Sequence, residues 1–583
     1  MSSSLASSLL RRLPAWLPAL VFTALFLALA APRWFDPASV LDDTRQFGPP
    51  LLWPPGAPPT NVPQLAYFAA GTPPLYRGLA LALIGALGWP PAAALKLLAV
   101  LLVLPTALGL WLLADGLVGD GPLAGGRGDA SPEKAVLALF LVGNVLVSTQ
   151  VLSGTPRDLG SLLLVLALVA LLHRRWLLLL PLLGLLAGVY PTYGLLLLAT
   201  LLIALLLEGA AASGAGCRRL LPLLIAAPLV ALLGVHWGGP AVQGQNWGPT
   251  LRLFVGTAPQ AQPPWAAVLA EAARSGGTGP ATLLAVPPLE LLATDRFRPL
   301  PGAKHLLPWI GSLALLALAA LMAALMAALP AALPLAWRQR PFPQGLPPWR
   351  RRVLLAVLLA GALLYSLAFA LAFALHNPAR YADLPARLLL SLAELAILQP
   401  LLAWPAFRPW SLLAALGLGL ALAMAVRPSG PVTLPLAALQ PLQDRLAAPL
   451  AAGGRARVLV LNPGGDSRLE ALNDALALVS GATSFYAQEL DRGFHLGAIA
   501  QNLALRRDRD WLARQRLDAA AGLPHPWLEA RGISHLLLVS PRAQAAGWTP
   551  ACRTAGPWRR RGREQLLLVD LACERRHTSE VTR

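Results

Sequence analysis

Runs of apolar residues, each about 20 residues long, recur along almost the whole sequence. A helix of that length crosses the hydrocarbon core of a bilayer, so this repetition constrains the fold more than any other feature. Of the 583 residues, 56% are hydrophobic and only 13% are charged, whereas about 25% charged residues is usual in a soluble protein. The sequence therefore predicts an α-helical polytopic membrane protein.

Hydropathy predicts about eleven membrane-spanning helices. Two of the segments, Leu159–Leu172 and Trp176–Val189, are short and could instead form a re-entrant pair. The first segment resembles a signal peptide, but no clear small-residue cleavage site follows it, so we interpret it as a membrane helix. The predicted spans are Leu13–Ala31, Trp89–Leu117, Ala135–Leu152, Leu159–Leu172, Trp176–Val189, Tyr193–Leu207, Leu220–Val235, Leu307–Leu335, Val353–Leu375, Leu384–Trp404 and Trp410–Val426.

Basic residues occupy every second connection between these segments. The positive-inside rule places such connections in the cytoplasm, so the N-terminus is expected inside and the C-terminal region outside. The long connections 32–88 and 236–306 also fall outside. Topology explains much of the net charge of +19, and nucleic acid is not an expected partner. The basic groups are Arg11-Arg12, Arg127 with Lys134, Arg174-Arg175, Arg218-Arg219, Arg338 and Arg340 with Arg350-Arg351-Arg352, and Arg408.

Two regions follow from this topology, a transmembrane region 1–426 and an extracytoplasmic α/β domain 427–583. In the second, Cys552 and Cys573 could form a disulfide in an oxidising compartment or remain two free thiols. In the first outer connection, Tyr76–Leu87 is too short to span and suits a helix lying in the membrane interface. The strand-like runs of the C-terminal region are Val458–Leu461, Ile533–Val539 and Gln565–Leu571, and Asp466–Val479 has helical periodicity.

Polar residues gather at the outer ends of the predicted spans. Asp42 and Asp43 stand where the first span leaves the bilayer. A carboxylate can deprotonate a hydroxyl, and arginine binds phosphate bidentately, so the combination suits a reaction on a phosphorylated lipid. The other polar residues are Arg45, Gln46, Tyr76, Arg77, Arg157, Asp158, Tyr190, Tyr193, Arg380 and Tyr381.

Each of these groups also has a structural interpretation. The aspartate pair could cap an interfacial helix, and Arg157 with Asp158 could form an ion pair at a helix start. The outer tyrosines and arginines, such as Arg380 and Tyr381, could anchor helices at the membrane surface. The sequence contains no Walker-type phosphate-binding loop, no Gly-x-Ser-x-Gly elbow and no metal-binding spacing of histidines.

The Asp-Asp-x-Arg-Gln stretch after the first span resembles the acidic first-loop motif of the GT-C superfamily, whose members are polytopic glycosyltransferases that use polyprenyl-phosphate sugars. Further stretches are similar to a group of large bacterial membrane proteins with that fold. They are Tyr67-Phe68 with Thr72-Pro73-Pro74-x-Tyr76-Arg77, Pro156-Arg157, Pro378-x-Arg380-Tyr381, and Glu489 with His495-Leu496-Gly497.

The resemblance implies a GT-C-like fold in the inner membrane and transfer of a sugar, with inversion, from a polyprenyl-phosphate donor to an acceptor outside the cytoplasm. Asp43, or Asp42, would be the catalytic base. The remaining outer residues would bind substrate. Arg45, Arg157 and Arg380 would hold the donor phosphate, Gln46, Tyr76 and Tyr381 would shape the sugar pocket, and Arg77 and Asp158 would complete the site.

The chain departs from the group at Phe47, where histidine is frequent. For the second outer acid that is common in such enzymes, only Asp158 or Asp383 is present, and a divalent cation stays open as a cofactor. Two other functions also stay open. One is a transporter or lipid-handling scaffold, for which Lys96 and Glu394 are the nearest intramembrane ionisable residues. The other is a polysaccharide ligase or polymerase.

Overall fold

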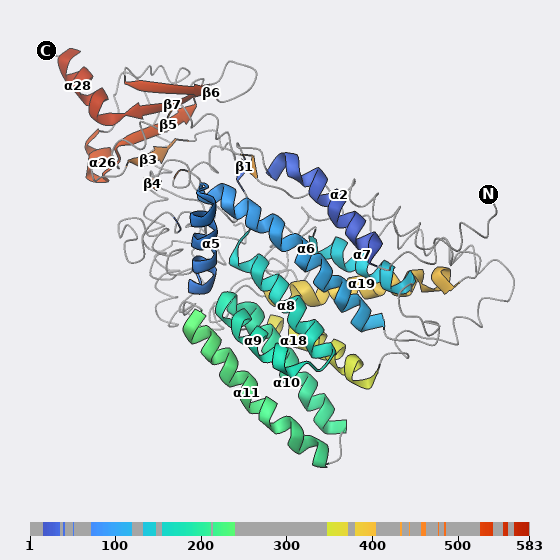
Figure 1. Ribbon diagram of the computed structural model, residues 1–583. Helices are drawn as coiled ribbons and strands as arrows, with labels where there is room; N and C mark the ends of the chain where they lie inside the picture. The colour runs from blue at the N-terminus through green and yellow to red at the C-terminus, as the bar shows by residue number, and fades with distance from the viewer. Residues whose placement is uncertain are drawn as a thin grey trace, which may run out of the picture.

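The helical part of the chain is a bundle that ends in a small β-sheet (Figure 1). The computed structural model describes residues 16–34, 39–40, 51, 72–118, 132–146, 154–211, 214–238, 347–370, 379–403, 432–433, 442, 456–461, 476, 483–484, 525–539, 552–557 and 565–581. The bundle consists of α2 (Leu17–Trp34), α5 (Pro74–Leu87), α6 (Pro91–Val118), α7 (Pro132–Leu146), α8 (Pro156–Leu172), α9 (Trp176–Val189), α10 (Pro191–Ala211), α11 (Gly214–Gly238), α18 (Pro348–Ala370) and α19 (Ala379–Ala403).

Proline sets the start of many of these helices. Proline is the first residue of α5, α6, α7, α8, α10 and α18. Its fixed φ suits the first helical position, and its missing N–H is one that the first turn would leave without an intrahelical partner. Several helices therefore start at a proline up to five residues before the apolar segment that predicted them, as α18 does at Pro348 instead of Val353.

The helical character of the chain is confirmed, but the number of spans is not. Two described helices, Pro91–Val118 and Pro191–Gly209, are long and apolar enough to cross a membrane. The apolar stretches Leu17–Leu29, Pro74–Leu87, Trp176–Val189 and Leu221–Gly234 are shorter. The predicted spans Leu307–Leu335 and Trp410–Val426 lie outside the described residues, and each of the others overlaps a helix. The count of eleven stays a prediction.

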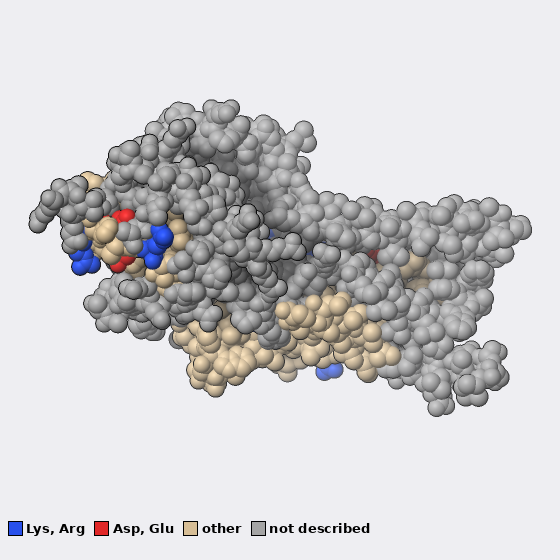
Figure 2. Space-filling model, turned by 90° about the horizontal axis from the view of Figure 1, so that it is seen from above, with Lys and Arg blue, Asp and Glu red and all other residues tan. Residues whose placement is uncertain are grey.

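Leucine and alanine fill the interior of the bundle, yet many leucines also lie on its surface. Leu108 in α6 is 56% exposed, and Leu232 in α11 is 65% exposed. In Figure 2 the described surface along the middle of the molecule is almost free of charge, whereas charged side chains gather at the end with the sheet. An apolar surface of this kind suits contact with lipid better than contact with water.

One end of the bundle, which we call the Glu208 end, is held by ion pairs. The carboxylate of Glu208 near the end of α10 accepts hydrogen bonds from Arg174 at 2.8 Å and from Arg352 of α18. The guanidinium of Arg174 lies 4.6 Å from the ring centroid of Trp349, whose indole N–H donates to the carbonyl of Leu171 at 2.9 Å. The ends of α8 and α10 therefore meet the start of α18 here.

A short β-ladder joins two distant parts of the chain. Strand β1 (Ser39–Val40) follows α2, and β2 (Val432–Thr433) follows the region of the last predicted span. They pair antiparallel, with Val40 opposite Val432. The connection that carries Asp42 and Asp43 therefore begins beside the segment that leads to the C-terminal sheet.

The C-terminal region contains a five-stranded mixed sheet in the order β4-β3-β5-β7-β6. Strand β3 runs parallel to β4 and β5, whereas β7 runs antiparallel to β5 and β6. The predicted strands near residues 458, 535 and 565 are confirmed, while the predicted boundary at 427 lies outside the described residues. The elements are β3 (Arg457–Val460), β4 (Thr483–Ser484), α26 (His525–Ala530), β5 (His535–Val539), β6 (Arg553–Pro557), β7 (Gln565–Asp570) and α28 (Leu571–Val581).

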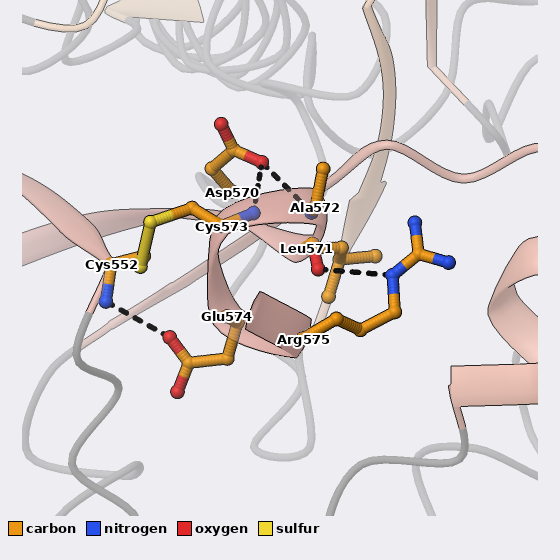
Figure 3. The surroundings of a disulfide bond; sticks show 7 residues. All are labelled: Cys552, Asp570, Leu571, Ala572, Cys573, Glu574 and Arg575. Atoms are coloured by element: carbon orange, nitrogen blue, oxygen red, sulfur yellow. Dashed lines mark hydrogen bonds between the residues drawn. A yellow bond between two sulfur atoms is a disulfide. The ribbon is translucent and has the colours of Figure 1, made fainter. Parts of the chain in front are cut away.

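A disulfide joins the segment before β6 to the first turn of α28 (Figure 3). Cys552 and Cys573 are bonded, with their Cα atoms 5.8 Å apart. Asp570 caps α28, because its carboxylate accepts the N–H groups of Ala572 at 2.9 Å and Cys573 at 3.2 Å. Glu574 accepts the N–H of Cys552 at 2.9 Å. Of the two alternatives for these cysteines, the structure has the disulfide.

Candidate functional site

The end of the bundle opposite Glu208 brings several helix starts together around Gly154. The hydroxyl of Tyr76, in the first turn of α5, donates to the carbonyl of Gly154 at 2.6 Å. Gly154 has φ +65°, and a Cβ atom there would lie 2.1 Å from the carbonyl oxygen of Leu95 in α6. Only glycine fits this position, which lies two residues before the first residue of α8. The starts of α5, α6 and α8 therefore converge.

Asp158 supports the backbone at this point. Its carboxylate accepts the N–H of Gly154, and its own N–H donates to the carbonyl of Thr155 at 3.0 Å. The side chain is fully buried. A carboxylate in the first turn of a helix that accepts a preceding N–H is a capping arrangement. The contact that the structure gives Asp158 is thus within the fold, and its predicted contact with substrate stays a prediction.

Two tyrosines extend this junction to α10. Tyr190 and Tyr193 pack edge to face, with ring centroids 4.8 Å apart. A Cβ atom on Gly160 of α8 would lie 2.8 Å from Cβ of Tyr190, so α8 closely approaches the turn between α9 and α10. The hydroxyl of Tyr190 is buried and makes no hydrogen bond to the part of the chain that the structure describes.

Two arginines and an aspartate surround Tyr193. Arg157 in the first turn of α8, with Arg380 and Asp383 at the start of α19, interacts electrostatically with the Tyr193 hydroxyl. Tyr193 itself is 3% exposed. We call this group of five residues, Arg157, Tyr190, Tyr193, Arg380 and Asp383, the Tyr193 site. It includes residues from three helix starts, and it contains two of the arginines that are predicted to bind phosphate.

The helix starts add to the positive charge of the Tyr193 site. The first N–H groups of a helix have no intrahelical partner, and the macrodipole places partial positive charge there. α8, α10 and α19 all begin at the site, and the Nε atoms of Arg157 and Arg380 are buried. Phosphate is the kind of ligand that helix starts and arginines bind together.

The other described candidates lie near the same end. Tyr76 is fully buried, and Leu51 from the first connection packs against it together with Leu95 of α6. Arg77 follows Tyr76 in the first turn of α5, and its Nε atom is also buried. Tyr381 is 2% exposed and belongs to the core of the bundle. Tyr76 and Tyr381 are therefore packed inside the fold instead of lying at its surface as anchors.

Four predicted site residues, Asp42, Asp43, Arg45 and Gln46, lie outside the described residues. The described positions on either side of them are Val40 in β1 and Leu51 beside Tyr76. Among the residues that the structure describes, no three His, Cys, Asp or Glu side chains form a group that could hold a metal ion.

The sequence pointed to Glu394 as an intramembrane ionisable residue and to Asp383 as an outer acid, but it did not predict the buried polar cluster between α7 and α19 that involves them. Asn144 donates from its side chain to Ser391 at 2.9 Å and to Glu394 at 3.0 Å. Arg387 donates to the backbone carbonyl of Asn144 and, at 2.9 Å, to the carboxylate of Asp383. The spacing Asp383-x-x-x-Arg387 predicts an ion pair on a helix. Only the structure shows that Arg387 also donates to the Asn144 carbonyl of α7.

Comparison of the sequence with models of protein families and with curated proteins finds no match. The candidate site therefore depends on the geometry above and on the motifs in the sequence.

Proposed function

We propose that this protein is a GT-C-type glycosyltransferase with about eleven transmembrane helices that moves a sugar from a polyprenyl-phosphate donor to an acceptor on the extracytoplasmic side. One observation carries the proposal. Arg157 and Arg380 lie at two different helix starts and both interact electrostatically with the buried Tyr193, so a bundle with a largely apolar surface has two arginines that act on one buried tyrosine. A lipid-linked phosphate combines the two chemistries that this arrangement suits, an apolar chain and an anionic head group.

The proposed reaction is a direct displacement. The acceptor hydroxyl loses its proton to Asp43, or to Asp42, and its oxygen attacks the anomeric carbon of the donor. The bond between that carbon and the phosphate oxygen breaks, and the polyprenyl phosphate leaves with the electron pair. Arg157 and Arg380, with Arg45, stabilise the charge that develops on the phosphate. Attack opposite the leaving group inverts the anomeric centre.

The other predicted residues have supporting roles in this proposal. Gln46 and Tyr381 shape the sugar pocket with Tyr76, which shares a buried cluster with Leu51 of the first connection. Arg77 lies one residue further along α5, near the start of α8, where it adds to the positive charge. Asp158 maintains the backbone turn that presents Arg157.

Two features support an extracytoplasmic site. The Cys552–Cys573 disulfide is of a kind that forms and persists outside the cytoplasm, and the C-terminal sheet lies toward the end of the bundle where α5 lies (Figure 1). The predicted cytoplasmic arginines Arg174 and Arg352 meet at the opposite, Glu208 end. Under the positive-inside rule, these contacts favour a Tyr193 site outside and a Glu208 end inside.

The proposal is tested by transfer of label from polyprenyl-phosphate-linked sugars in purified membranes. Asp43→Asn is expected to lower the rate by about 10²–10⁴-fold, which is the usual contribution of a general base. Asp115→Asn is the matched control, since this carboxylate pairs with Lys134 at 2.7 Å in another part of the bundle and should leave transfer near the native rate. Transfer that continues in a chain with alanine at both Asp42 and Asp43 would rule out the mechanism.

The buried cluster of Asn144, Arg387 and Glu394 favours a second candidate, a transporter of lipid-linked sugars. Ionisable side chains inside a membrane bundle often mark a transport path. Reconstituted vesicles separate the two functions, because a transporter moves labelled lipid between leaflets without an acceptor, whereas a transferase forms a glycosylated product. Transport that is unaffected by Asp43→Asn, with no product formed, would favour the transporter.

A further inference from the structure

Arg387 connects the Tyr193 site to the interior of the bundle. Its guanidinium donates to the carboxylate of Asp383 at 2.9 Å and also to the backbone carbonyl of Asn144. The Arg387 side chain is only 6% exposed, and that of Asp383 is 14% exposed. A buried arginine that bridges a carboxylate and a carbonyl has a fixed direction, because its planar fork satisfies both partners at once.

The contact with Asn144 fixes α7 to α19. The carbonyl of Asn144, in α7, accepts the hydrogen bond from Arg387 of α19, so this contact bridges the two helices. The side chain of Asn144 bonds to Ser391 and Glu394, one and two turns further along α19. Arg387 is therefore held from both sides, which in turn fixes the position of Asp383.

Asp383 has two positively charged neighbours on its own helix. Arg380 precedes it by three residues and Arg387 follows it by four, so both lie on its side of α19. Arg387 balances the negative charge of Asp383, so this carboxylate offsets less of the positive charge that Arg157 and Arg380 bring to the site. Without Arg387 it would offset more of that charge, since Asp383, Arg157 and Arg380 all interact electrostatically with Tyr193.

We infer that Arg387 is a positioning residue of the Tyr193 site: it holds and neutralises Asp383, and thereby keeps the site able to bind an anionic lipid head group. Arg387 touches no reacting atom in this role and acts through Asp383. That the anion is the phosphate of a polyprenyl donor rests on the function proposed above.

The test measures binding, separately from sugar transfer. The full chain in detergent is titrated with polyprenyl phosphate, and with the uncharged polyprenol as a reference, and occupancy is read by native mass spectrometry. Arg387→Gln is expected to weaken phosphate-dependent binding about tenfold, in the range typical of one coupled charge. In the double variant Arg387→Gln/Asp383→Asn, binding should return to within about threefold of native, because the competing carboxylate is gone.

Two further variants keep the inference testable if Arg387→Gln does not fold. Asp383→Asn alone should bind polyprenyl phosphate as tightly as the native chain or more tightly, and weaker binding would overturn the inference. Lys134→Gln is the matched control, because Lys134 is also a buried cation paired with an acid, Asp115, at 2.7 Å, and it should bind like the native chain. A double variant that binds as weakly as Arg387→Gln would also overturn the inference.

The two hypotheses fail in different ways. A native chain that binds polyprenyl phosphate in the expected pattern but transfers no sugar supports the role of Arg387 and refutes the proposed function. If the native chain transfers sugar but Arg387→Gln binds polyprenyl phosphate as tightly as the native chain, the proposed function is supported and the role of Arg387 is refuted. A native chain that prefers polyprenol or shows no binding overturns the role inferred for Arg387.

Discussion

Two aspartates that look equivalent in the sequence have different surroundings in the structure. Asp158 and Asp383 each stand close to an arginine near the start of a predicted span. Asp158 accepts the N–H of Gly154 and is fully buried, whereas Asp383 pairs with Arg387 and interacts electrostatically with Tyr193. The sequence predicts acids at this end of the bundle, but the direction of each side chain depends on neighbours from other helices.

Gly154 is the residue on which we expect the site to depend most. Gly154→Ala should destabilise the protein by about 2 kcal/mol or more, because the new Cβ would lie 2.1 Å from the carbonyl oxygen of Leu95 at a positive φ. Gly78→Ala is the control, since among the described residues, apart from the backbone of its own helix, no atom lies within 4 Å of its Cβ, and alanine favours a helix. Thermal unfolding in detergent compares them, and equal midpoints would contradict the structure.

His535 should make the C-terminal sheet sensitive to pH. Burial lowers the pKa of His535, although Asp570 opposes the shift. The unfolded chain then binds a proton more readily than the folded chain, so the free energy of unfolding falls as pH drops through the ordinary histidine pKa of about 6.5 toward the lower folded value. Proteolysis of the sheet in urea at pH 8 and pH 5 measures this loss. His535→Asn should show a smaller difference, and an unchanged difference would exclude His535 as the cause.

At the scale of elements, the sequence predicted which segments are helical better than where they begin. α5 was expected at Tyr76–Leu87, and its end is correct because Gly88 adopts φ +63° and caps the helix. Its start lies two residues earlier, at Pro74. Hydropathy ranks residues by their affinity for lipid and takes no account of the preference of proline for the first helical position. The prolines at these helix starts are visible in the sequence, and they predict the starts better than hydropathy does.

The disulfide is expected to stabilise the C-terminal sheet. Replacing Cys552 and Cys573 by serine should lower the free energy of unfolding of this region by about 3 kcal/mol, because the cross-link closes a loop of 21 residues in the unfolded chain. Denaturation followed by protease resistance of the sheet measures the effect. The hydrogen bond between Ser534 and His535, 2.8 Å long, should persist in the folded variant, because neither residue belongs to the disulfide. A variant with native stability would show that the bond has no such role.

At the scale of the whole molecule, the sidedness of the charges was more predictable than their contacts. The alternation of basic connections separates Arg174 and Arg352 from Arg157 and Arg380. In the structure the first pair shares the carboxylate of Glu208, and both members of the second pair interact electrostatically with Tyr193. Loop charge alone cannot predict that Asn144 of α7 meets Glu394 of α19, because the partners are 250 residues apart. Such contacts depend on which faces of two helices pack together. The helices are apolar on nearly all sides, so their sequence pattern does not determine those faces.

The pairing of β1 with β2 has a consequence for how the protein is made. Val40 leaves the ribosome early, and its partner Val432 follows about 390 residues later, which at 5–20 residues per second is about 20–80 s. For that interval the segment that carries the two aspartates has no strand to pair with. Under the proposed function, a chain still being synthesised would already contain its base and most of its arginines, yet could not hold them in place. The enzyme would then become competent only near the end of its own translation.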